Sequence, residues 1–192
     1  MKLFSSLYNK LLNWARHPKA PRYLGILSFA ESSFFPIPPD VMLMPMVLAK
    51  PKNWLYLATL TTVTSVLGGI TGYFIGVFAF ETLEPLIVQW GYGEKITLAK
   101  SRFDELGVWI IFAAGFSPIP YKIFTITGGA LSMALIPFIF ASIIGRGARF
   151  FTISALLAWS GPKMEPVLIR YIEWLGWFVV GALILIILMT QV

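Results

Sequence analysis

Five charged residues lie in stretches of the sequence that are otherwise apolar, namely Glu31, Asp40, Lys122, Arg146 and Arg149. In a bilayer each such charge costs about 2.5–3.5 kcal/mol on insertion scales, so five of them are too many to be incidental. Burial disfavours the charged form of a carboxyl group and a nearby cation favours it, so an acid that moves between these surroundings can load and release a proton. We therefore predict that Glu31 and Asp40 are proton-coupling acids.

The three cations are candidate ligands for an anionic group. Arg146 and Arg149 are three residues apart, which puts them on one face of a helix. Two guanidinium groups placed in this way can hold a phosphate or a carboxylate through partly bidentate hydrogen bonds. We predict that Lys122, Arg146 and Arg149 bind the head group of a substrate. A purely structural network of ion pairs would use the same residue types, and this alternative stays open.

Two Pro-Ile-Pro turns interrupt the apolar segments that carry the acids and the lysine. They contain the prolines Pro36, Pro38, Pro118 and Pro120. Proline breaks a helix, and in hydrocarbon the freed backbone groups must be satisfied by protein or by water in a cavity, so broken helices at membrane depth are typical of binding sites. Each arm is shorter than the roughly 20 residues that a span needs. We therefore predict two re-entrant helical hairpins, at 22–49 and 108–136.

The remaining segments complete a single, all-α membrane domain over residues 1–192. The other predicted elements are an amphipathic interfacial helix at 1–21, transmembrane helices at 54–80, 137–159 and 171–189, and an extracytoplasmic linker at 81–107 that contains a short amphipathic helix at about 94–106. In the first span, glycines recur at intervals of four, at Gly68, Gly72 and Gly76. Such a stripe lets another backbone approach closely, so its predicted role is helix packing.

Composition limits the classes of protein that the chain can belong to. With 57% hydrophobic and 12% charged residues among 192, it is expected to be an integral membrane protein. The net charge of +6 comes from basic residues that flank apolar segments, which is typical of membrane topology and argues against nucleic-acid binding. The chain has no cysteine and one histidine, His17, in a basic stretch. We therefore expect no metal site, no cofactor and no enzymatic activity.

A hairpin followed by a span occurs twice, which indicates an internal duplication. Seven basic residues precede the first span and the linker carries a net charge of −2, so the basic side is predicted to be cytoplasmic. Lys50 and Lys52 then lie on the side where the first hairpin starts, as a re-entrant segment requires. Fully crossing segments would put both lysines outside. The prediction is a pair of inverted repeats in the cell (inner) membrane, with a cytoplasmic N-terminus and an extracytoplasmic C-terminus.

Four motifs follow one another in a fixed order over about residues 23–159. They are the acids and prolines Glu31, Pro36, Pro38 and Asp40; the glycine-rich Gly68, Gly69, Gly72, Tyr73 and Gly76; Gly115-Phe116; and Gly128-Gly129 followed by Met133 and Phe138. In this order and spacing the sequence resembles the DedA superfamily, also called VTT-domain or SNARE-associated Golgi proteins, and especially its short YqaA-like branch. The resemblance implies re-entrant hairpins in inverted repeats, a role in membrane lipid homeostasis and dependence on the proton-motive force. In several members it also implies transport of lipids such as undecaprenyl phosphate or glycerophospholipids.

One region departs from the family pattern. Many members carry two arginines around the second hairpin's proline, where this chain has Ser117 and Lys122, so Arg146 and Arg149 are candidates for the missing cations. The leading hypothesis is a proton-linked flippase or scramblase, whose partners are protons and membrane lipids, either an anionic phospholipid or a polyprenyl phosphate. The alternatives are a proton-coupled transporter of small ions and a non-transporting assembly protein with a structural ion-pair core. A homo-oligomer is left open.

Overall fold

The computed structural model describes residues 15, 17–90, 93–117 and 120–160, and every regular element in these ranges is helical. The elements are α2 (Ala20–Ser33), α3 (Asp40–Ala49), the 3₁₀ turn η1 (Pro51–Asn53), α4 (Trp54–Gln89), α5 (Gly93–Phe116), α6 (Tyr121–Ala130) and α7 (Leu135–Ser160). The predicted span at 171–189, and almost all of the predicted helix at 1–21, lie outside the described residues.

Two helical stretches in the described part of the chain are long and apolar enough to cross a membrane. They are Pro51–Leu86, with 36 residues, and Leu135–Ser160, with 26 residues. Their outer faces carry large apolar side chains that other described residues leave uncovered, such as Phe78, 65% exposed, and Ile144, 58% exposed. Extensive exposed apolar surface is unusual on a soluble monomer. The chain is thus an all-α membrane protein, as its composition predicts.

The first predicted break is present between α2 and α3. The amides of Phe34 and Phe35 both donate to the Ala30 carbonyl oxygen, at 2.8 and 2.7 Å, which ends α2. Pro36 and Pro38 follow, and because proline has no amide hydrogen, neither can continue the ladder of helical hydrogen bonds. A new helix starts at Asp40.

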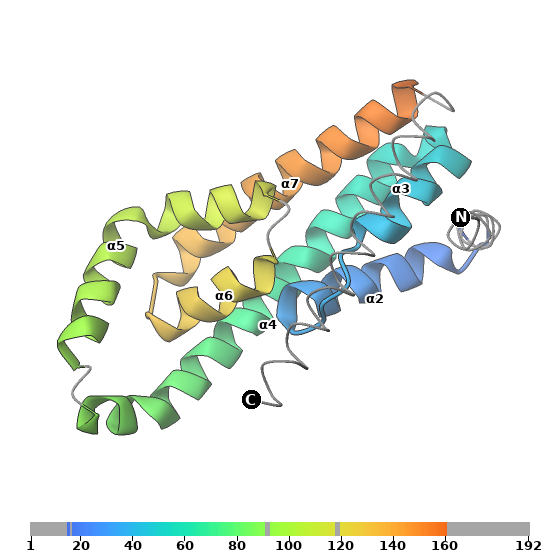
Figure 1. Cartoon of the computed structure of the whole chain (residues 1–192). Helices are drawn as coiled ribbons and strands as arrows, with labels where there is room; N and C mark the ends of the chain where they lie inside the picture. Colours follow the sequence, from blue (N-terminus) through green and yellow to red (C-terminus); the bar gives the residue numbers. More distant parts are fainter. Residues whose placement is uncertain (1–14, 16, 91–92, 118–119, 161–192) are drawn as a thin grey trace, which may run out of the picture.

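The second break lies between α5 and α6. Pro120 has an extended ψ of 109° and immediately precedes the first residue of α6, whereas Pro118 lies outside the described residues. Figure 1 shows that α2–α3 and α5–α6 form two helical hairpins whose breaks lie near the middle of the molecule and approach it from opposite ends. The breaks therefore meet beside α4 and α7, the two long helices.

The segment predicted as a linker is largely helical. Helix α4 continues nine residues beyond the predicted end of the span at residue 80, to Gln89, and α5 begins at Gly93 and runs into the arm predicted from residue 108. An ion pair of 3.1 Å between Lys100 and Glu84 joins the two helix ends. Polar residues show where a chain leaves hydrocarbon, but Glu, Lys, Leu and Ala are also good helix formers, so the helices need not end there.

The stripe of three glycines lies against helices α2 and α6. A Cβ atom on Gly68 would lie 2.1 Å from the carbonyl oxygen of Phe29 in α2, and one on Gly76 would lie 2.0 Å from that of Ile126 in α6. Gly72 lies against both helices. Only glycine permits such close approach of two backbones. Helix α4 is thereby held between one helix of each hairpin.

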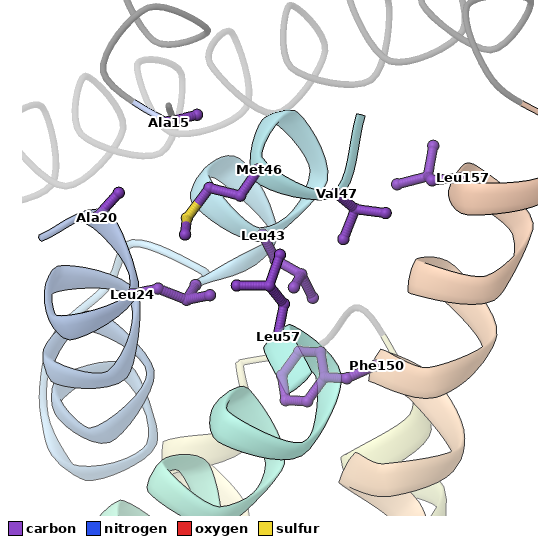
Figure 2. Close-up of a cluster of buried hydrophobic side chains, with 9 residues drawn as sticks. All are labelled: Ala15, Ala20, Leu24, Leu43, Met46, Val47, Leu57, Phe150 and Leu157. Carbon is purple, nitrogen blue, oxygen red and sulfur yellow. The ribbon is translucent and has the colours of Figure 1, made fainter. Parts of the chain in front are cut away.

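Two apolar clusters pack the helices together. In the first, shown in Figure 2, Leu24 of α2, Leu43 of α3, Leu57 of α4 and Phe150 of α7 converge. In the second, residues of α4, α5, α6 and α7 converge, among them Tyr73, Ile111, Tyr121 and Phe138. Both clusters thus join elements of the first and second halves of the chain, so the domain has no boundary between them.

Replacing Gly68 with alanine should destabilise the protein, because the new methyl group would overlap the Phe29 carbonyl group and push α2 away from α4. We expect a loss of about 1–3 kcal/mol in the free energy of unfolding. The measurement is denaturant unfolding in detergent micelles, followed by circular dichroism. Gly147→Ala is the matched control, since the nearest atom to its Cβ would be a Thr62 methyl carbon at 3.8 Å. Equal stability of the two variants would contradict this packing.

Candidate functional site

A buried ion pair joins the first hairpin to the last described helix. Nη2 of Arg146, in α7, lies 2.6 Å from Oε2 of Glu31, in the last turn of α2, and both side chains are more than nine-tenths buried. Nε of the same guanidinium group donates to the Ser65 hydroxyl of α4, also at 2.6 Å. One arginine thus ties together three helices.

Two serine hydroxyls surround this pair. The Ser32 hydroxyl donates to Oε2 of Glu31 at 3.1 Å and lies 2.7 Å from the Ser65 hydroxyl oxygen. Nη2 of Arg146 also lies within 3.4 Å of the Ser32 hydroxyl. A buried charge is tolerable when such hydrogen bonds satisfy its remaining polar atoms, so the serines stabilise the pair in its closed form.

Two aromatic rings contact the Arg146 guanidinium group. Its Cζ atom lies 4.9 Å from the ring centre of Tyr121 and 4.6 Å from that of Phe150. Cation–π contacts of this kind are worth about 2 kcal/mol when they are desolvated. The Tyr121 hydroxyl group is hydrogen-bonded to Ser142. Because Tyr121 begins α6, the second hairpin contributes directly to the surroundings of the pair.

A second ion pair joins the start of α3 to α7. Nη2 of Arg149 donates to Oδ2 of Asp40 at 2.7 Å, and Nη1 lies 3.3 Å from the carbonyl oxygen of Phe116, the last residue of α5. Asp40 is the first residue of α3, where the helix dipole favours a carboxylate. Its other oxygen, Oδ1, is buried and has no hydrogen-bond partner among the described residues. Orphaned buried oxygens are rare and mark sites that need an explanation.

Lys122 occupies a different position from the two arginines. It lies in the first turn of α6, and its Nζ atom is 3.4 Å from the carbonyl oxygen of Phe34, which follows the last residue of α2. A cation is favoured at that end of a helix. The structure therefore puts Lys122 between the two hairpin breaks, and the hydrogen bond it makes is to backbone and not to Glu31 or Asp40.

In this conformation the two arginines do not share one open anion site. Each guanidinium group binds a carboxylate of its own, Arg146 with Glu31 and Arg149 with Asp40. An incoming phosphate would have to take the place of a carboxylate. The arrangement can therefore couple two events chemically, the loss of negative charge on an acid and the binding of an anion by its arginine.

Sequence reasoning missed the residues that surround the charges, namely Ser32, Ser65, Tyr121 and Phe150. One signal for Ser65 was available. Ser65 precedes Gly68 by three residues and Gly72 by seven, so it lies on the same face of α4 as the glycine stripe. The Ser65 hydroxyl group could therefore have been expected to be buried at a helix contact, where it could bind a buried charged side chain.

Comparison with known proteins identifies the family. The family model of the VTT domain, the domain of the DedA and SNARE-associated proteins, matches residues 37–158. The chain belongs to the VTT domain family. This confirms the family resemblance of the sequence. The matched range of the VTT domain includes Asp40, Lys122, Arg146 and Arg149, whereas Glu31 precedes it.

Curated relatives of this VTT domain protein share its length. An uncharacterized protein of Haemophilus influenzae is 46% identical over 180 residues, which cover 94% of each chain. An uncharacterized protein of Histophilus somni is 47% identical over 191 residues, which cover 100% of each chain. No solved structure matches the chain. The names of these relatives carry no activity to transfer.

The variant Arg146→Met should be strongly destabilised, because it leaves the Glu31 carboxylate buried without its cation. We expect a loss of about 3–5 kcal/mol in the free energy of unfolding. Adding Glu31→Gln should restore most of the loss, since neither charge then remains. Denaturant unfolding in detergent micelles measures both variants.

The control for this pair is the partly exposed ion pair between Lys100 and Glu84. Lys100→Met should lower the free energy of unfolding by no more than about 1 kcal/mol. A double variant Glu31→Gln/Arg146→Met that is as unstable as Arg146→Met alone would show that the two charges are not energetically coupled.

Proposed function

We propose that this VTT domain protein is a proton-linked flippase or scramblase of anionic, phosphate-bearing lipids in the cell membrane. One observation carries the proposal: two buried acid–arginine pairs lie at the breaks of the first hairpin and tie it to α7. Ionisable residues within a membrane domain mark substrate or proton pathways. Two arginines that can exchange a carboxylate partner for a phosphate are suited to bind an anionic lipid head group.

The packing of the helices supports inverted repeats, α2–α4 and α5–α7. Helix α2 packs on α4 as α5 packs on α7, and α3 packs on α7 as α6 packs on α4. The two long helices run antiparallel, because Ser65 faces Arg146 whereas Gly69, further along α4, faces Phe138, which is earlier in α7. Equivalent helices of opposite direction are what an inverted duplication requires.

The lengths of the broken helices support re-entrant hairpins. Helices α3 and α6 have 10 residues each, which corresponds to about 15 Å, half of the hydrocarbon thickness. The apolar part of α5, Glu105–Phe116, is also shorter than a span. Hairpins that enter from opposite faces and end near the middle would bring their breaks together at the ion pairs, with the N-terminus cytoplasmic and the C-terminus extracytoplasmic.

The proposed mechanism exchanges one partner of each arginine. When Glu31 or Asp40 takes up a proton, its arginine loses a carboxylate partner and becomes a ligand for a lipid phosphate. When the lipid leaves, the acid releases its proton and the pair forms again. The orphaned Oδ1 oxygen of Asp40 is a position where a proton can be accepted without breaking a hydrogen bond. Lys122, between the breaks, adds a third positive charge for the head group.

Transport is tested with the purified protein in phosphatidylcholine vesicles that contain fluorescent phosphatidylglycerol or, in parallel, a labelled polyprenyl phosphate. Dithionite bleaches label in the outer leaflet only, so the bleached fraction reports movement across the bilayer. We expect movement that needs the protein and increases with a pH gradient, and its loss in the double variant Glu31→Gln/Arg146→Met, in which neither buried charge remains. Lys100→Met should transport normally. Folded protein that moves neither lipid, with or without the gradient, would overturn the proposal.

A second candidate is an assembly protein whose ion pairs are only structural. The closed and buried geometry of both pairs favours it. The double variant Glu31→Gln/Arg146→Met separates the two functions. A transporter of the proposed kind should lose lipid movement although the variant is stable, whereas an assembly protein should keep its cellular function. Proton flux without lipid movement would instead indicate the alternative of a small-ion transporter.

A further inference from the structure

A groove runs along the outside of the protein between α2 and α4. It encloses about 370 Å³ and is lined by Pro21, Arg22, Gly25, Ile26, Phe29, Tyr56, Leu60 and Thr64. The lining is apolar except for Arg22 at one end and the Tyr56 and Thr64 hydroxyl groups. None of its residues takes part in the two ion pairs, so the groove is separate from the site described above.

The shape of the groove suits one hydrocarbon chain. Tyr56, Leu60 and Thr64 follow one another at intervals of four along α4, which makes a stripe about 12 Å long. Gly25 lies at the floor of the groove, where a Cβ atom would lie 3.3 Å from the Thr64 methyl carbon and 3.7 Å from a Leu60 methyl carbon, so a larger side chain has no room there without displacing the lining. Ile26, 65% exposed, flanks this floor.

The two helices run in the same direction, which defines the ends of the groove. Gly25 faces Leu60 and Thr64, whereas Phe29, one turn later in α2, faces Gly68. Arg22 and Tyr56 therefore lie at the same end, and Lys52 and Trp54 come shortly before Tyr56 in the sequence. Basic and aromatic residues together are typical of the membrane–water interface. In the proposed membrane arrangement, the apolar end, at Phe29, points toward the interior of the bilayer.

We propose that this groove binds one acyl chain of an anionic phospholipid, with the lipid phosphate at Arg22. The exposed guanidinium group supplies a bidentate partner for phosphate at interface depth, and the apolar stripe below it supplies the contact surface for the chain. The site is independent of transport. It should bind lipid equally well in the double variant Glu31→Gln/Arg146→Met, which leaves no buried charge unpaired, so failure of the proposed transport function would leave it standing.

The test uses the full-length protein in phosphatidylcholine vesicles that contain a small fraction of phosphatidylglycerol with a photoreactive diazirine in its acyl chain. After illumination, mass spectrometry locates the labelled peptides. We expect label to concentrate on residues 21–29 and 56–64. Arg22→Glu should reduce it about fivefold, since a basic residue near the membrane surface contributes roughly that factor in affinity for anionic lipid. Gly25→Leu should abolish it by filling the floor.

Matched variants keep the test decisive. Lys52→Glu changes a charge at the same end of α4 but outside the groove, and it should leave the labelling unchanged. If Gly25→Leu does not fold, Ile26→Trp fills the same space from an exposed position, and Ile144→Trp on α7 is its control. Label spread evenly over the exposed faces of α4 and α7, or equal effects of Arg22→Glu and Lys52→Glu, would overturn the proposal. Equal labelling by diazirine-bearing phosphatidylcholine would overturn the role of Arg22.

Discussion

The hydrogen-bonded ion pair between Glu31 and Arg146 connects helices that are distant in the sequence and cannot be exposed to lipid without a large penalty. Its geometry requires α2, α4 and α7 to meet at one point, because the guanidinium group also binds the Ser65 hydroxyl. The second pair, between Asp40 and Arg149, adds α3 and the end of α5. The arrangement of the hairpins follows from the need to keep these charges paired and out of hydrocarbon.

Close backbone contact makes this arrangement possible. A serine side chain reaches only a short distance, so Ser65 can bind Arg146 while Ser32 lies 2.7 Å away only if α2 and α4 nearly touch. One turn along α4, Gly68 lies directly against the α2 backbone. The glycines and the charged residues therefore depend on each other. Glycine allows α2 and α4 to lie close together, and only at this short distance can the two serine hydroxyl groups form hydrogen bonds with the ion pair.

The sequence predicted the membrane class, the first helix break and the family, because each follows from local chemistry: apolar content, prolines and ordered motifs. It also identified the charged residues. It could not predict that Arg146 binds Glu31 and Arg149 binds Asp40, because pairing depends on how α7 is rotated against α2 and α3. Nor could it show that α4 continues beyond residue 80, because polar residues mark where a segment leaves the membrane but do not prevent the helix from continuing. The aromatic rings around Arg146 come from two elements and have no common sequence signal.

The order of synthesis gives the buried pairs a further consequence. Glu31 and Asp40 are made 115 and 109 residues before their arginines. Because protein synthesis adds about 5–20 residues per second, both acids are present for roughly 5–25 seconds in an incomplete chain that does not yet contain their arginines. If the first hairpin is re-entrant, as proposed, its two unpaired acids disfavour a stable position in hydrocarbon during that time. Its final insertion would then follow the synthesis of α7, and a chain interrupted before Arg146 would contain two unpaired carboxylates.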